Sequence, residues 1–187
     1  MSTKVKTGKV RFGYVNAFTP RAQGDEKDEK YSVMIIIDKK DKVTLSALKE
    51  AVEAAKEVGK EKSWGGKIPA KLTLPLRDGD EEKPDSPELA GKYFLNAKSK
   101  NKPGVVKIVN GSVTPIEDPA EFYSGCFGKA VFNLYPYSFN GNRGVGVGLN
   151  NLLFLEHGEP LAGGASAQED FADEEGVEDE SAESWME

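Results

Sequence analysis

The sequence predicts a mainly β protein, a β-barrel or β-sandwich into which one α-helix is inserted. About seven short segments have the apolar patterns of strands, turn residues separate them, and only one stretch has the longer periodicity of a helix. A chain of 187 residues has room for one domain of ordinary size with a hydrophobic core.

Residues 5–15 are expected to form the first strand. Val10, Phe12 and Tyr14 share an apolar face there, and basic residues and a glycine alternate with them. The strand is therefore expected to have one apolar and one basic face. A polar loop is expected to follow over residues 16–29.

A central strand and the single helix come next. Residues 30–38 are apolar on both faces beyond Ser32, which is typical of a strand covered on both sides. Asp41 or Thr44 can cap the helix that follows, because apolar residues then recur at three- and four-residue steps. Gly59 is the expected C-terminal stop of this helix.

The second half of the chain supplies the remaining strands. A short segment interrupted by prolines suits an edge strand, and the next two segments are expected to form a hairpin. Asn140-Gly141 predicts a tight turn between the last two strands. Residues 78–87 are expected to form an acidic, turn-rich loop. The expected strands are residues 71–76, 93–100, 105–109, 130–139 and 145–155.

Charge is distributed unevenly along the chain. The net charge is −6, yet residues 1–161 carry 25 basic and 21 acidic residues, or +4. Residues 162–187 carry ten acidic residues and no Lys or Arg, and such a segment buries too little apolar surface to offset its ordering entropy. We therefore expect a folded domain over residues 1–161 and a disordered acidic tail over residues 162–187. Phe171, Trp185 and Met186 are a candidate partner-binding segment in this tail, and a solvated tail with incidental aromatics is the alternative.

Composition argues against several classes of protein. The only cysteine, Cys126, and the only histidine, His157, cannot supply a structural zinc site or a Cys/His nucleophilic pair with any spare ligand. One cysteine allows no internal disulfide, which favours a reducing cytoplasm. No apolar run is long enough to span a bilayer, and the polar N-terminus has no secretory signal. We expect no catalytic residue, no metal and no cofactor.

Residues 130–139 are the first candidate for binding chemistry. Alternation places Phe132 and Leu134 on a core face and Tyr135 and Tyr137 on the other face, from which two rings could stack on the bases of single-stranded nucleic acid. The alternative is that both tyrosines are interior residues of a two-sided sheet. Lysines and arginines cluster around this strand and could bind phosphates without reading sequence. The candidate nucleic-acid-binding residues are Arg21, Lys30, Trp64, Arg77, Lys98, Lys100, Lys102, Tyr123, Lys129, Tyr135, Tyr137 and Arg143.

Two other interpretations stay open. Asp78 and Asp80 could serve a metal-dependent nuclease, although the spacing of the acidic residues lacks the calcium-loop pattern. The folded domain over residues 1–161, here called the body, could instead be a protein-interaction module without nucleic-acid binding. The glycines between residues 141 and 148 do not predict a phosphate loop, because no Lys-Ser/Thr and no helix follow them. In a strand, such glycines mark tight coiling or a close approach of the backbone.

Seven segments of the body together resemble a family of phage-encoded single-stranded-DNA-binding proteins. They occur in order over nearly all of the body: FTP (18–20), KYSV (30–33), PLRDGD (75–80), YFLNAKSK (93–100), FYSGCFGK (122–129), YPYSFNGNRGVGVGLNN (135–151) and HGEPL (157–161). The resemblance implies an OB-type Greek-key β-barrel with long loops and one inserted α-helix. It also implies a non-enzymatic protein that coats and protects single-stranded DNA with little sequence specificity, during phage DNA replication or recombination.

The resemblance further implies the partners. The acidic tail is similar to tails that recruit phage or host replication and recombination proteins and compete with DNA for the basic groove. The expected compartment is the cytoplasm of an infected bacterium, with no membrane contact. RNA and duplex DNA stay open as weaker additional ligands, and a homodimer as an option for the oligomeric state.

Overall fold

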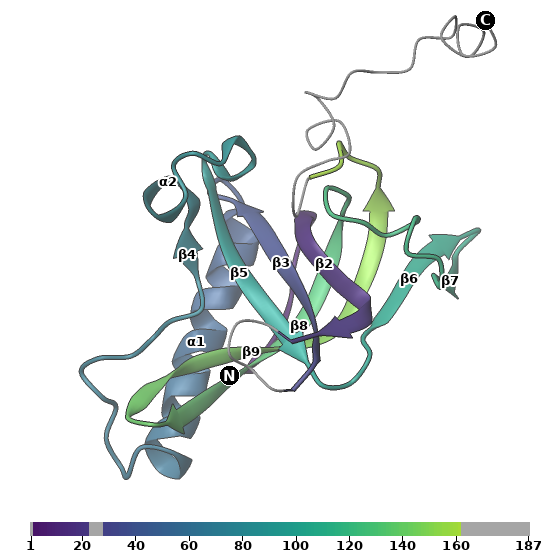
Figure 1. The fold of residues 1–187 in the computed structure, drawn as a ribbon. Helices are drawn as coiled ribbons and strands as arrows, with labels where there is room; N and C mark the ends of the chain where they lie inside the picture. Colours follow the sequence, from purple (N-terminus) through teal and green to yellow (C-terminus); the bar gives the residue numbers. More distant parts are fainter. Residues whose placement is uncertain (1, 23–27, 162–187) are drawn as a thin grey trace, which may run out of the picture.

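The computed structural model describes residues 2–22 and 28–161, which fold as a mainly β structure with one long helix (Figure 1). No helix within these two ranges is long and apolar enough to cross a membrane. The elements in chain order are β1 (Lys4–Lys6), β2 (Val10–Arg21), β3 (Lys30–Asp38), α1 (Lys42–Lys62), β4 (Arg77–Asp78), α2 (Gly79–Glu82), the 3-10 helix η1 (Pro87–Leu89), β5 (Lys92–Ser99), β6 (Gly104–Val109), β7 (Ser112–Pro115), β8 (Phe127–Phe139) and β9 (Asn142–Glu156).

Five of the strands close into a barrel. β2 pairs with β8 and β3, β3 pairs with β5, β5 pairs in parallel with β9, and β9 pairs back with β8. A five-stranded closed sheet in this mixed order is the OB-type architecture, so the predicted fold class is confirmed. β1 adds to β8, and the β6–β7 hairpin continues the sheet from β9 and extends away from the barrel (Figure 1).

The core fills the barrel with the inward side chains of alternating strand residues. Val33, Ile35 and Ile37 of β3 are buried there together with Phe132 and Leu134 of β8. The predicted core face of residues 130–139 and the predicted covered strand over residues 30–38 are therefore confirmed. The buried face of α1, formed by Leu48, Ala51 and Ala55, packs on the same core.

Helix α1 begins where the sequence predicts and ends later. The Asp41 side chain caps it by accepting the Thr44 backbone N–H at 3.1 Å. The predicted stop at Gly59 is wrong, because the helix continues to Lys62. Gly59 is instead buried where the helix meets Trp64, and a Cβ atom there would lie 2.6 Å from the indole ring. The glycine is needed for this close packing, not to end the helix.

The predicted first strand and the loop after it are both corrected. The segment is split into β1 and β2, because the Thr7 hydroxyl accepts the Ala130 N–H at 3.0 Å and the Gly8 N–H turns to the Thr44 hydroxyl at 2.9 Å. β2 then continues to Arg21 through what the sequence predicts to be loop. Two register shifts let this long strand follow β3 around the barrel.

The predicted hairpin of residues 93–100 and 105–109 is also wrong. β5 and β6 do not pair with each other, because each pairs in parallel with a different part of β9. The partner of β6 in a hairpin is β7, which the sequence pattern did not predict.

The segments on either side of residue 77 also differ from expectation. Residues 71–76 form no strand, only an isolated bridge from Thr73 to Gly144. The predicted loop over residues 78–87 contains the end of β4, α2 and the start of η1.

Candidate nucleic-acid interface

Two adjoining cavities form one groove across the outer face of the barrel. Their volumes are about 420 Å³ and about 350 Å³, and both are lined by Asn96 and Lys98. We call this surface the basic groove. Its lining residues are Tyr14, Asn16, Lys30, Ser32, Val33, Met34, Arg77, Lys83, Phe94, Asn96, Lys98, Ser99, Lys100, Tyr135, Gly146 and Val147.

Strand alternation explains the floor of the basic groove. The inward residues of β5, Leu95 and Ala97, are buried in the barrel core, so the residues between and beside them face outward. In the β3–β5 pairing, Ser32 lies opposite Lys98 and Met34 lies opposite Asn96. The groove therefore crosses the middle of the sheet, over the face that OB-type barrels use to bind oligonucleotides.

The lining of the basic groove is cationic. Lys30, Arg77, Lys83, Lys98 and Lys100 contribute five positive charges, and no acidic side chain lines it among the residues that the structure describes. Lys100 Nζ lies 3.9 Å from Asp28 Oδ2 in an exposed ion pair. Exposed pairs of this kind contribute little, so a phosphate can replace the carboxylate.

Tyr135 provides a flat aromatic surface at one end of the basic groove. It lies opposite Gly146 in the β8–β9 pairing and is 45% exposed. A Cβ atom on Gly146 would lie 2.5 Å from Cζ of Tyr135, so the ring packs directly on the glycine backbone. The glycine run of β9 thus creates the close approach that the sequence suggested, and it leaves part of the ring exposed.

Tyr14 provides a second exposed aromatic side chain in the other cavity. The sequence predicts that it shares an apolar strand face with Val10 and Phe12, but those two residues are buried and Tyr14 is 50% exposed. Its φ of 43° lies in the left-handed region, at a register shift between Gly13 and Asn16. The bulge breaks the alternation of β2, and this turns Tyr14 out of the core face.

The structure brings five of the twelve predicted binding residues into the basic groove. The five are Lys30, Arg77, Lys98, Lys100 and Tyr135. Tyr137 and the exposed Arg143 lie further out on the β8–β9 hairpin, where Trp64 Nε1 donates to the Tyr137 carbonyl at 3.1 Å.

Arg21 and Tyr123 line a third cavity. Its volume is about 280 Å³, and it adjoins the basic groove through Asn16. Arg21 lies opposite Lys30 in the β2–β3 pairing, which places it beside the groove. The Tyr123 hydroxyl instead makes hydrogen bonds to Nδ1 of His157 at 2.9 Å and to the Gly158 carbonyl at 3.2 Å. It therefore fastens the segment after β9 to the barrel.

Trp64, Lys102 and Lys129 lie outside the basic groove. Trp64 is only 7% exposed and packs in the barrel core, so the expectation that its ring stacks on bases is corrected. Lys102 is exposed between β5 and β6, and Lys129 is half-buried opposite Leu153. Phe171, Trp185 and Met186 lie outside the described residues.

Eleven of the sixteen residues that line the basic groove were not predicted, and among these are four whose polar or aromatic side chains could contact a ligand: Asn96, Tyr14, Asn16 and Lys83. Asn96 has the same strand parity as Lys98, so the alternation of β5 could have identified it. A bulge in β2 places Tyr14 and Asn16 at the groove, and residues 77–91, which return to the sheet, place Lys83 there. No local sequence pattern indicates the bulge or the path of this segment.

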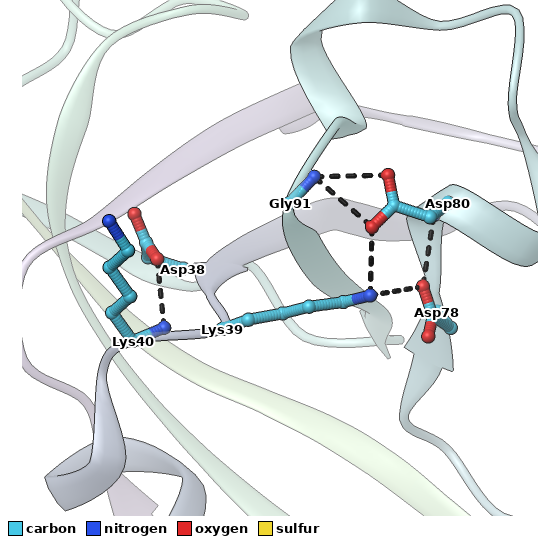
Figure 2. Close-up of polar contacts among 6 residues, drawn as sticks. All are labelled: Asp38, Lys39, Lys40, Asp78, Asp80 and Gly91. Atoms are coloured by element: carbon cyan, nitrogen blue, oxygen red, sulfur yellow. Dashed lines mark hydrogen bonds and ion pairs between the residues drawn. The ribbon is translucent and has the colours of Figure 1, made fainter.

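The acidic loop has a different role from the metal site considered above. Figure 2 shows that Lys39 Nζ lies between Asp78 and Asp80, 2.8 Å from one carboxylate oxygen of each. An ammonium in this position occupies the place that a cation would need. Among the described residues, no three His, Cys, Asp or Glu side chains are grouped to hold a metal ion.

Comparison with known proteins identifies what the chain is similar to. A family model described as the ssDNA-binding protein of Enterobacter phage Enc34 matches residues 3–182. The structure of the single-stranded DNA-binding protein from bacteriophage Enc34 in complex with ssDNA superposes with a TM-score of 0.73 at 23% identity, over 86% of this chain and 90% of that one. The gp2.5 single-stranded DNA-binding protein of bacteriophage T7 superposes with a TM-score of 0.60 at 19% identity, over 94% and 96% of the two chains. A search of the curated proteins finds no match.

Proposed function

Because the chain belongs to the family of the ssDNA-binding protein of Enterobacter phage Enc34, we propose that it binds single-stranded DNA in the basic groove. The observation that carries the proposal is the composition of that groove, in which five cations and two exposed tyrosines line one continuous surface. Phosphates need cations along a path, and unstacked bases need ring faces beside it. The basic groove offers both.

The expected binding has little sequence preference. Lysine and arginine contacts to phosphates carry no sequence information, and every base has a π-face on which a tyrosine can stack. Lys30, Arg77, Lys98 and Lys100 are proposed to track the backbone, and Tyr135 to stack a base. Arg21, Tyr137 and Arg143 are proposed to extend the path beyond the groove. RNA and duplex DNA are proposed as weaker ligands, because these contacts discriminate weakly between nucleic acids.

The proposed biological role is to coat and protect single-stranded DNA during phage DNA replication or recombination, in the cytoplasm of an infected bacterium. Residues 1–161 are proposed to bind DNA. Residues 162–187 are proposed to recruit replication or recombination proteins through Phe171, Trp185 and Met186, and to compete with DNA for the basic groove. The contrast between a +4 body and a tail with ten acidic residues supports this competition. A homodimer remains part of the proposal.

Deleting residues 165–187 is expected to tighten binding to single-stranded DNA and to abolish partner recruitment. The deletion removes ten carboxylates and no basic residue, so less negative charge competes for the lysines of the groove. The measurement is fluorescence anisotropy of a labelled oligo-dT of about 30 nucleotides, with both proteins at two salt concentrations. Weaker binding by the truncated protein would show that the tail does not compete with DNA.

The chain is not an enzyme, since its family is one of DNA-binding proteins. The alternative, a protein-interaction module without nucleic-acid binding, predicts a different result in the same experiment. A body that only docks other proteins would not respond to the oligonucleotide at low salt, with or without the tail. Salt-sensitive binding by the full-length protein is the outcome that supports the proposed function.

A further inference from the structure

Lys39 joins three segments at one end of the basic groove. It follows β3, and its Nζ lies 2.8 Å from Asp78 Oδ1 and 2.8 Å from Asp80 Oδ2. The same ammonium lies 5.1 Å from the centre of the Tyr93 ring on β5. Figure 2 shows the extended Lys39 side chain reaching from the turn after β3 to the two carboxylates.

The carboxylates belong to residues 77–91, a segment that returns to the sheet at both ends. Asp78 accepts the Asp80 N–H at 2.9 Å, and Asp80 accepts the Gly91 N–H at 3.1 Å (Figure 2). The Lys39 N–H donates to the Gly91 carbonyl at 3.1 Å. Lys39 is therefore bonded to the start and the end of this segment, through its side chain and its backbone.

Residues 77–91 also carry two of the cations of the basic groove. Arg77 and Lys83 line the larger cavity, and the Arg77 guanidinium lies 5.9 Å from the centre of the Phe94 ring in the groove floor. The segment is otherwise acidic, because it contains Asp78, Asp80, Glu81, Glu82, Asp85 and Glu88. Arg77 Nε also pairs with Glu82 at 3.1 Å. Because residues 77–91 carry both basic and acidic side chains, the placement of this segment determines which charges face the groove.

We propose that Lys39 is a positioning residue for single-stranded DNA binding: it holds residues 77–91 so that Arg77 and Lys83 face the basic groove and the Asp78 and Asp80 carboxylates do not. This inference rests on the proposed function. Lys39 does not line the groove and acts through the segment that it holds. The position of a basic residue at a binding surface does not indicate such a role, because Lys39 lies outside that surface.

The protonation states of Lys39, Asp78 and Asp80 support a contact between them that persists near neutral pH. The hydrogen bond that Lys39 donates to Asp78 holds the pKa of the Asp78 carboxyl below its usual value. The pKa of the Asp80 carboxyl is lowered by a second hydrogen bond from Lys39 and by the Gly91 N–H. The two carboxylates in turn raise the pKa of Lys39. A carboxyl group whose pKa is lower in the folded than in the unfolded protein stabilises the fold at any pH above its unfolded pKa. This stabilisation is lost only as the pH falls through the pKa of the folded protein. The contribution of Lys39 to DNA binding should thus be constant between about pH 6 and pH 8.

The test compares variants by anisotropy with a labelled oligo-dT. Lys39→Met is expected to weaken binding about fivefold, because residues 77–91 lose the two partly buried ion pairs that hold Arg77 and Lys83 at the groove. The triple variant Lys39→Met, Asp78→Asn, Asp80→Asn should stay weaker than wild type, although it removes two negative charges beside the groove. Local electrostatics alone would make the triple variant bind as well as wild type or better, and that result would overturn the proposal. Lys40→Met is the matched control, since it removes an exposed neighbouring charge.

A double-mutant cycle separates positioning from direct contact. If Lys39 positions Arg77, then Arg77→Met should cost less in the Lys39→Met background than in the wild type. Additive effects would instead assign Lys39 its own phosphate contact and contradict the proposal. Lys39→Arg should restore most of the affinity, because a guanidinium can also donate to both carboxylates. A wild-type protein that binds no oligonucleotide would overturn the proposed function and this inference together, whereas wild-type binding with additive variants would overturn only this inference.

Discussion

Replacing Lys30, Lys98 and Lys100 together by methionine is expected to weaken binding of single-stranded DNA about 100-fold at ~0.1 M salt. Each neutralised phosphate contributes about 0.7 to the slope of log affinity against log salt for a single strand, so three contacts contribute about 2. All three side chains line the smaller cavity of the basic groove. The measurement is a salt titration of oligo-dT binding, in which the slope of the variant should be smaller by about 2.

A matched control tests whether position or total charge matters. Lys42, Lys49 and Lys60 are exposed on α1 and line neither cavity of the groove. Replacing these three by methionine makes the same change in net charge, and it should leave most of the affinity and the slope intact. Equal losses in both triple variants would mean that DNA binding depends on overall charge and not on the basic groove.

Replacing Tyr135 by alanine is expected to weaken oligo-dT binding between about 5-fold and 150-fold, since base–aromatic stacking contributes roughly 1–3 kcal/mol per base. The salt slope should not change, because no cation is removed. Tyr135→Phe should keep most of the affinity, since the ring is retained. A loss in the phenylalanine variant as large as in the alanine variant would argue that the hydroxyl, and not stacking, carries the interaction.

Gly146 offers an independent test of the same ring. A methyl group at Gly146 would collide with the outer end of the Tyr135 side chain at 2.5 Å, so Gly146→Ala should turn the ring off β9 and reduce affinity. Gly148 is the matched control on the same strand, because its Cβ atom would meet the Asn133 carbonyl at 3.7 Å and Tyr135 at 3.8 Å. Gly148→Ala should bind DNA like the wild type. Equal affinities of both alanine variants would contradict the packing role of Gly146.

Local periodicity predicted most of the barrel and part of the groove. Alternation placed Phe132 and Leu134 in the core and Tyr135 outside, and the structure confirms this division. The covered strand β3 and the cap of α1 at Asp41 were also predicted, because both depend on residues that are close in sequence. These elements position the floor of the basic groove and one of its two exposed tyrosines.

Long-range pairing decided what the sequence could not predict. The parallel pairings of β5 and β6 with β9 replace the expected hairpin, and nothing in either strand specifies a partner that follows it along the chain. Trp64 is predicted to stack on bases, but α1 and the β8–β9 hairpin enclose it. Tyr14 leaves the apolar face of β2 because of a bulge. Lys83 reaches the groove because Lys39 and Gly91 hold residues 77–91 next to the start of β5.

Six of the seven segments that carry the family resemblance separate into two groups, and the seventh, FTP, contributes Phe18 and Thr19 to the third cavity. KYSV, PLRDGD, YFLNAKSK and the β8–β9 segment contribute residues to the basic groove. FYSGCFGK and HGEPL instead contact each other, through Tyr123 with Gly158 and through the Leu161 N–H with the Ser124 carbonyl at 2.8 Å. Among the described residues, these contacts hold the segment after β9 against the barrel. Burial raises the pKa of the Cys126 thiol, which lies in the first of the two segments.

The central claim is that a single strand of DNA lies in the basic groove, and photo-crosslinking tests it most directly. A single-stranded oligonucleotide that contains bromodeoxyuridine would be irradiated with the full-length protein, and the modified peptides would be mapped by mass spectrometry. The account predicts crosslinks at Tyr135 and Tyr14, lost on competition with unlabelled oligo-dT. Crosslinks confined to other surfaces, such as the β6–β7 hairpin or the exposed face of α1, would contradict it.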